Sequence, residues 1–203
     1  MTINELIKDF IWRYMRIDTQ WHLLAYMLTL IFAFVLVKYY KKKNLSISRC
    51  ILLVILFLYL TTIYMSTVMS RRYNPGVKIS LKPFNSWRRA FAGNRYAIKM
   101  VLENLIMLMP VGFLLLFIDR RKKGYIRAVG VGFLFSLFIE ISQYLRKTGL
   151  FEVDDLINNT LGVFIGCGLA TLILKAVQLI NEHLLTNKKK HGSGSEKSGK
   201  VAK

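Results

Sequence analysis

The sequence is short of acidic residues, histidine and cysteine, and each shortage argues against a class of protein. In 203 residues there are 11 Asp and Glu against 30 Lys and Arg, so the formal net charge is +19. The two cysteines, Cys50 and Cys167, show no CxxC spacing, which argues against a disulfide framework and a zinc site. The three histidines are scattered without a helical ligand spacing. We therefore assign no metal and no cofactor to the chain.

Long apolar runs are what the chain has in abundance. Apolar residues make up 54% of the composition, and five runs are suited to crossing about 30 Å of hydrocarbon. These runs are 21–37, 51–69, 98–118, 128–145 and 156 to about 180. The basic clusters lie at or near the ends of such runs, which favours a membrane protein over a nucleic-acid-binding protein. The predicted fold class is all-α, a polytopic transmembrane helical bundle of about five spans, with the lipid bilayer as partner and no nucleic acid.

The chain divides into five parts along its length. Residues 1–20 have apolar side chains on one helical face, which predicts an amphipathic helix that lies on the membrane or packs on the rest of the protein. Residues 21–69 form two spans, residues 70–97 an extramembrane loop, and residues 98–180 a core of three spans. Residues 181–203 form a basic tail without apolar periodicity, which we expect to be flexible.

The distribution of Lys and Arg predicts an orientation in the membrane. The short connections 38–49 and 120–127 and the tail carry denser basic charge than the loops on the other side. Cytoplasmic loops are enriched in Lys and Arg, so the amino terminus is expected outside and the carboxyl terminus inside. The loop 70–97 and the connection 146–155 then lie on the extracellular face.

Unusual polarity is confined to the last three spans. On a helix, Ser136, Glu140 and Gln143 are spaced i, i+4, i+7 and share one face. Further polar side chains lie at the starts of the third and fifth spans. The candidate site residues are Glu103, Asn104, Glu140, Gln143, Asp154, Asp155, Asn158 and Asn159. A carboxylate at the centre of a membrane costs about 2.5 to 3.5 kcal/mol on insertion scales, so this cluster is the first candidate for function.

One face of the fifth span changes along its length from polar to small side chains. The residues at the spacing i, i+4, i+7, i+11 are Asp155, Asn159, Gly162 and Gly166. The two glycines form a GxxxG motif, which lets another helix approach closely. The connection between the fourth and fifth spans is short, so these spans form an antiparallel hairpin. We therefore expect Gln143 to meet Asp155 and Asn159 at the extracellular end.

Several uses of this cluster remain open at the level of the sequence. Converging carboxylates repel one another, and a shared proton or a bound cation relieves the repulsion. The cluster would then be a divalent-metal site, a proton relay or a pocket for a cationic ligand. One aspartate of the pair would alternatively cap the start of its own helix. The competing interpretation is a purely structural network of hydrogen bonds between helices.

Four motifs in one order resemble the VanZ-like family of membrane proteins. They are Ile79-Ser80-Leu81-Lys82-Pro83-Phe84, then Glu103-Asn104 with Pro110-Val111-Gly112, then Ser136 to Gln143, and finally Asp154-Asp155 to Gly162. The resemblance runs from about residue 79 to residue 168. It implies a small helical membrane protein from a family associated with low-level resistance to the glycopeptide teicoplanin in Gram-positive bacteria.

This chain departs from the family pattern before the paired aspartates. Many relatives have an arginine there, whereas this chain reads Thr148-Gly149-Leu150-Phe151-Glu152-Val153. An anion-binding role for that arginine therefore does not carry over.

The leading functional hypothesis is binding or exclusion at the membrane surface, without covalent chemistry and without an assigned catalytic residue. An extracellular acidic pocket would hold the basic amine of a lipophilic glycopeptide, in a multi-pass protein of the bacterial plasma membrane. The pocket comprises Glu103, Glu140, Gln143, Asp154, Asp155 and Asn159. Two alternatives are an enzyme that acts on a lipid or lipid-linked cell-wall precursor through a carboxylate-held metal, and a proton-coupled lipid transporter. The transporter would need a homodimer, formed through the Gly162 face, because the chain shows no internal repeat.

Overall fold

Five helices that are long and apolar enough to cross a membrane make up the fold. The computed structural model describes residues 5, 8, 19–43, 46–74, 76, 78–121 and 123–198. Within them the candidate spans are Thr19–Tyr40, Ile47–Met69, Arg95–Ile118, Gly124–Leu145 and Val153–Leu184. These spans confirm the predicted all-α class and the number of crossings. The amphipathic helix expected at 1–20 falls almost wholly outside the described residues.

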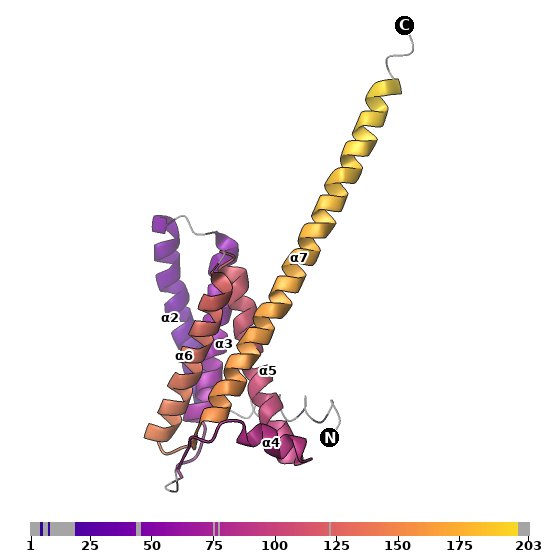
Figure 1. Cartoon of the computed structure of the whole chain (residues 1–203). Coiled ribbons are helices and arrows are strands. Elements are labelled where there is room, and N and C mark those ends of the chain that lie inside the picture. The colour runs from indigo at the N-terminus through magenta and orange to yellow at the C-terminus, as the bar shows by residue number, and fades with distance from the viewer. Residues whose placement is uncertain are drawn as a thin grey trace.

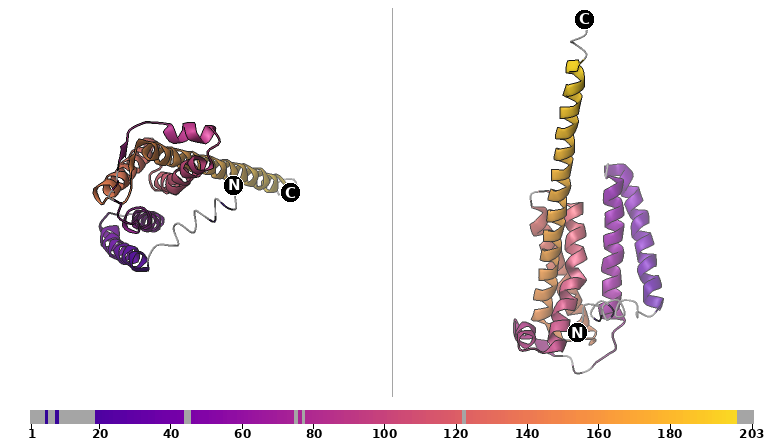
Figure 2. Two further views of the ribbon diagram at one scale, coloured as in Figure 1. Left: turned by 90° about the horizontal axis from the view of Figure 1, so that it is seen from below. Right: turned by 90° about the vertical axis from the view of Figure 1, so that its right-hand side faces the viewer.

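Successive long helices run in opposite directions through the bundle (Figure 1). In chain order they are α2 (Thr19–Lys43), α3 (Ile47–Tyr64), α5 (Arg95–Ile118), α6 (Gly124–Leu145) and α7 (Val153–Ser198). The short elements are the π-helix η1 (Met65–Met69), β1 (Ile79–Ser80), α4 (Asn85–Phe91) and β2 (Phe151–Glu152). In Figure 2, α2 and α3 pair to one side of the group formed by α5, α6 and α7. The last three spans, which hold the unusual polar residues, therefore form a unit of their own.

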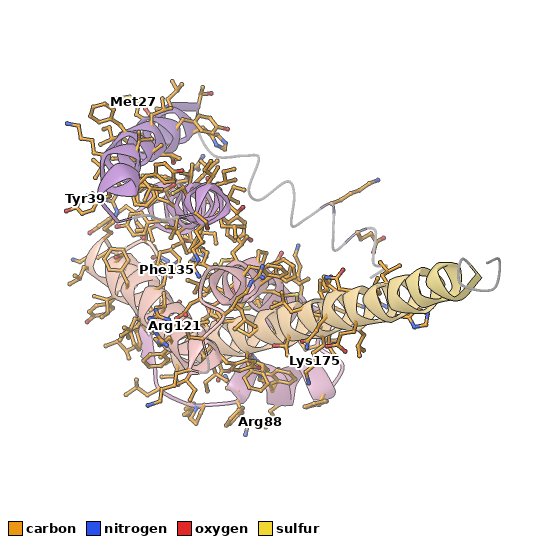
Figure 3. The ribbon with its side chains drawn as sticks, turned by 90° about the horizontal axis from the view of Figure 1, so that it is seen from above. Met27, Tyr39, Arg88, Arg121, Phe135 and Lys175 are labelled. Carbon is orange, nitrogen blue, oxygen red and sulfur yellow. The ribbon has the colours of Figure 1, made fainter. Side chains whose placement is uncertain are left out.

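Large apolar side chains cover much of the outer surface of the bundle. On α2, Met27 is 59% exposed and Tyr39 is 54% exposed. Figure 3 shows both on α2, at the edge of the molecule away from Arg88 of α4. A helix that is apolar all round is typical of a span surrounded by hydrocarbon. The exposed surface thus supports a multi-pass membrane protein.

Glycines bring α7 into backbone contact with α5, the most extensive helix contact in the described structure. A Cβ atom at Gly162 would overlap the carbonyl oxygen of Leu105, and one at Gly166 would overlap the carbonyl oxygen of Met109. The GxxxG motif therefore packs two helices of the same chain, as expected for small residues at such an interface. Because α5 already covers this face, the Gly162 face is not available for the homodimer that the sequence left open.

The loop after η1 is tied to the connection between α6 and α7. The strands β1 and β2 pair in parallel, with Ile79 opposite Phe151 and Ser80 opposite Glu152. The Asn74 backbone N–H also donates to the Lys147 carbonyl oxygen at 2.6 Å. Both segments that were expected on the extracellular face therefore lie together at one end of the bundle (Figure 1).

The helix α7 is longer than the sequence predicted. The fifth span was expected to end near residue 180 and to be followed by a flexible tail, but α7 continues to Ser198. Its carboxyl-terminal part extends past the rest of the bundle (Figure 2). The expectation was based on burial, whereas the hydrogen bonds of an α-helix are made within the helix and require no neighbour.

Gly162→Ala is expected to lower the melting temperature of the purified protein in detergent. The added methyl group would meet the Leu105 backbone, which has no free rotamer to move aside, and overpacking of this kind costs about 1 to 3 kcal/mol. Gly168→Ala on the same helix is the matched control, because a Cβ there has no other atom within 4 Å. Equal melting temperatures for the two variants would contradict the close α5–α7 packing.

Candidate functional site

A partly enclosed cavity of about 480 Å³ lies at the end of the bundle that carries α4 and the two strands. Its walls come from η1 and the loop after it, the first half of α5, the end of α6, the connection that contains β2, and the start of α7. The predicted site residues that line it are Glu103, Asn104, Glu140, Gln143, Asp155 and Asn159. Residues from three separate spans therefore converge as the sequence predicted.

Asp154 and Asn158 do not line this cavity. Successive residues of an α-helix point about 100° apart, so the two aspartates at the start of α7 cannot face the same way. Asp155 and Asn159 face the cavity, whereas Asp154 and Asn158 share the neighbouring face, which is directed at α4. The prediction that Asp154 belongs to the pocket was wrong for this geometric reason.

Asp154 and Asn158 instead hold the short helix α4 against α7. The Ser86 backbone N–H, in the first turn of α4, donates to Asp154 Oδ2. The Trp87 side chain donates through Nε1 to Asn158 Oδ1 at 2.7 Å. A carboxylate at a helix start satisfies a backbone N–H group that has no partner within the helix. Asp154 thus caps a helix, as one interpretation of the sequence proposed, but the capped helix is α4 and not its own.

The amide side chains around the cavity form hydrogen bonds between spans. Asn104 Nδ2 of α5 donates to Asp155 Oδ1 of α7 at 2.6 Å. Asn159 Nδ2 donates to Ser136 Oγ of α6 at 2.9 Å. These bonds join α5, α6 and α7 around the cavity, so part of the cluster has the structural role that the sequence left open.

The π-helix η1 joins the network through its backbone. Gln143 Nε2 of α6 donates to the Thr67 carbonyl oxygen at 3.0 Å. A π-helix bonds residue i to residue i+5, as in the 2.9 Å bond from Ser70 N–H to the Met65 carbonyl. The wider turn alters the local direction of the backbone groups. It is one reason why a carbonyl of this span meets a side chain of α6.

The fourth carboxylate at the cavity is Glu152, in place of the predicted Asp154. Its backbone N–H donates to Glu140 Oε2 at 3.0 Å, and Glu140 is only 2% exposed. Burial raises the pKa of the Glu152 carboxyl, the Arg89 charge opposes this rise, and the charge of Asp154 adds to it. On α5, Lys99 Nζ lies 4.0 Å from Glu103 Oε1. The acidic groups are thus at least partly buried, and positive charges of Lys99 and Arg89 lie near two of them.

The divalent-metal interpretation finds no ligand set in the part of the chain that the structure describes. No three His, Cys, Asp or Glu side chains there gather closely enough to hold a metal ion. The carboxylates share a cavity but do not converge on a single point.

The cavity residues that were not among the predicted site residues include Arg71, Tyr96 and Glu152. Helical periodicity could have identified Tyr96, which lies seven residues before Glu103 on α5. The approach of Glu152 depends on its strand pairing and on Glu140. Arg71 carries no local signal, because charges at the end of a span usually face the lipid headgroups.

Asp154→Ala is expected to release α4 from α7. Loss of the cap would leave the Ser86 N–H without its acceptor, so trypsin should cleave faster after Arg88 and Arg89 in α4. Asp119→Ala is the control, because Asp119 pairs with Arg121 at the other end of the bundle. Cleavage rates can be followed by mass spectrometry of the purified protein. Unchanged cleavage in Asp154→Ala would show that this carboxylate does not hold α4.

The part of the chain that resembles known proteins is the part that contains the cavity. The family model described as VanZ/LLP1 matches residues 47–174, a range that contains every cavity residue named above. Protein VanZ from Enterococcus faecium is 29% identical over 143 residues, which are 67% of this chain and 78% of that protein. No solved structure matches the chain. With more than half of its length matched, the chain belongs to the VanZ/LLP1 family.

Proposed function

We propose that this chain protects Gram-positive bacteria against lipophilic glycopeptide antibiotics such as teicoplanin, by binding at the extracellular face of the plasma membrane. The observation that carries the proposal is the convergence of Glu103, Glu140 and Asp155, from three spans, on one cavity at a single end of the bundle. Family membership is in accord with this role.

The charge of the cavity favours a cationic group as its occupant. Glu140 is 2% exposed, so its carboxylate is largely removed from water. A buried charge is costly unless it is paired, and a bound amine would supply the pairing. The basic amine of a glycopeptide antibiotic has the required charge and hydrogen-bond donors.

The dimensions of the cavity favour partial enclosure of such an antibiotic. A volume of about 480 Å³ lies within the range that encloses a drug-sized molecule, and a whole glycopeptide is larger. Only the amine-bearing end would enter, while the acyl chain of the antibiotic would lie along the apolar outer surface of the spans. Both parts of an amphiphilic antibiotic thereby find a matching environment.

The placement of the cavity supports action outside the cytoplasm. It lies at the same end as the loop after η1 and the connection between α6 and α7. Under the orientation predicted from Lys and Arg, that end faces the cell exterior, where a glycopeptide acts. Binding there would lower the amount of antibiotic that reaches its target, without any covalent reaction.

Glu140→Gln and Asp155→Asn are each expected to abolish protection in a teicoplanin-sensitive Gram-positive host. Each change removes a negative charge at nearly constant volume, so the cavity keeps its shape and loses attraction for an amine. The minimum inhibitory concentration of teicoplanin should fall from that of the intact chain to that of the empty vector.

Asp119→Asn provides the matched control, since it neutralises a carboxylate at the opposite end of the bundle. Membrane levels of all variants are compared by immunoblot. Full protection by both cavity variants at normal membrane levels would overturn the proposed role of the cavity. An intact chain that fails to protect would remove the resistance function itself.

A further inference from the structure

Arg71 places a positive charge at the edge of an otherwise acidic cavity. It lies two residues after η1, lines the cavity and is exposed. A Cβ atom built on Gly149 would lie 3.0 Å from Arg71 Nη1 and 3.0 Å from Gln143 Oε1, so the guanidinium lies beside the connection between α6 and α7. Among the described residues, Arg71 takes part in no hydrogen bond or ion pair. Its N–H groups are therefore available to an anion.

Asn159 supplies an unused acceptor on the buried side of the same cavity. The residue is 1% exposed, and its amide nitrogen is occupied by the bond to Ser136. Its side-chain oxygen is buried and has no hydrogen-bond partner within the described structure. Buried polar atoms are nearly always paired, so an orphaned acceptor in the wall of a cavity points to a missing donor.

The carboxylates beside Asn159 have spare acceptor capacity as well. The hydrogen bonds of the described residues engage Oε2 of Glu140 and Oδ1 of Asp155. A carboxylate has two oxygens and accepts several hydrogen bonds. The inner part of the cavity can therefore surround a group that carries several N–H donors and a positive charge.

A ligand with charge of only one sign would match either Arg71 or the carboxylates, but not both. Arg71 and the carboxylates already attract one another across the cavity. A simple cation would be repelled by Arg71, and a simple anion would be repelled by Glu140 and Asp155. We infer that the cavity binds a primary ammonium carried beside a phosphate, the headgroup chemistry of an aminophospholipid. The phosphate lies at Arg71, and the ammonium lies among Asn159, Glu140 and Asp155. This inference rests on the proposed function, because it assigns a ligand to the same cavity.

The position of Arg71 favours a lipid as the source of this headgroup. Arg71 lies two residues after the span Ile47–Met69, at the level where lipid phosphates are found. A guanidinium binds phosphate through two parallel N–H bonds. A phospholipid already in the membrane would then need only to turn its ammonium inward to reach Asn159.

The test is lipid binding to the purified full-length chain, measured by native mass spectrometry with lipids of equal chain length. Phosphatidylethanolamine carries both required groups. Phosphatidylglycerol lacks the ammonium, and phosphatidylcholine has the charge but no N–H donor. We expect phosphatidylethanolamine to bind about tenfold more tightly than either, as loss of one charge-assisted hydrogen bond implies. Equal binding of the three lipids would overturn the inference.

Two arginine variants locate the phosphate subsite. Arg71→Gln is expected to weaken phosphatidylethanolamine binding by about tenfold, because a charge-assisted contact is lost. Arg72→Gln is the matched control, since Arg72 is adjacent and exposed but does not line the cavity. Equal affinity of the two variants would refute the role of Arg71. Their melting temperatures show whether both remain folded.

Two further comparisons separate the source of the headgroup and the dependence on the proposed function. Free phosphoethanolamine that binds as tightly as the lipid would overturn the lipid source, while the pairing of ammonium and phosphate would stand. Selective lipid binding by an intact chain that gives no protection against teicoplanin would remove the resistance function and leave the ligand class intact. Protection that depends on Glu140 without selective lipid binding would overturn the inferred ligand class and leave the resistance function intact.

Discussion

Close packing of α7 on α5 is the constraint on which the rest of the structure depends. Gly162 and Gly166 let the two backbones touch, and side chains larger than hydrogen would separate them. One and two turns before Gly162 on α7, the same side of the helix carries Asn159 and Asp155, and Asp155 is held by Asn104 of α5. The small residues thus fix the distance at which the polar residues of the cavity meet. An arrangement of carboxylates inside a membrane protein is therefore set by residues that have no polar side chain at all.

The cavity combines a structural network with unused binding capacity. Amide groups of Asn104, Gln143 and Asn159 each donate across a helix interface, which stabilises the positions of the spans. The groups that remain available to a ligand are the side-chain oxygen of Asn159, the second oxygens of Glu140 and Asp155, and the guanidinium of Arg71. The same residues can serve packing and recognition, because each uses one atom for a neighbour and another for the cavity.

Much of this architecture follows from the sequence, and the remainder depends on distant contacts. The length of the apolar runs predicted the five spans, and the helical spacing of Ser136, Glu140 and Gln143 predicted a shared face. Both signals are local in the sequence. The separate roles of Asp154 and Asp155 depend on the rotation of α7 and on the place of α4, which no local pattern encodes. Arg71 was missed because it enters the site from a different span. The extended α7 was missed because a helix needs no burial to complete its own hydrogen bonds.

The first turn of α7 connects the interior of the bundle with its outer surface. Asp154 is fixed to α4, and the adjacent Asp155 is fixed to α5 inside the cavity. Adjacent residues of a helix point about 100° apart, so one turn of α7 reaches both the outer helix and the interior. The placement of α4 outside the bundle and the placement of Asp155 in the cavity wall are thus set by one turn of helix.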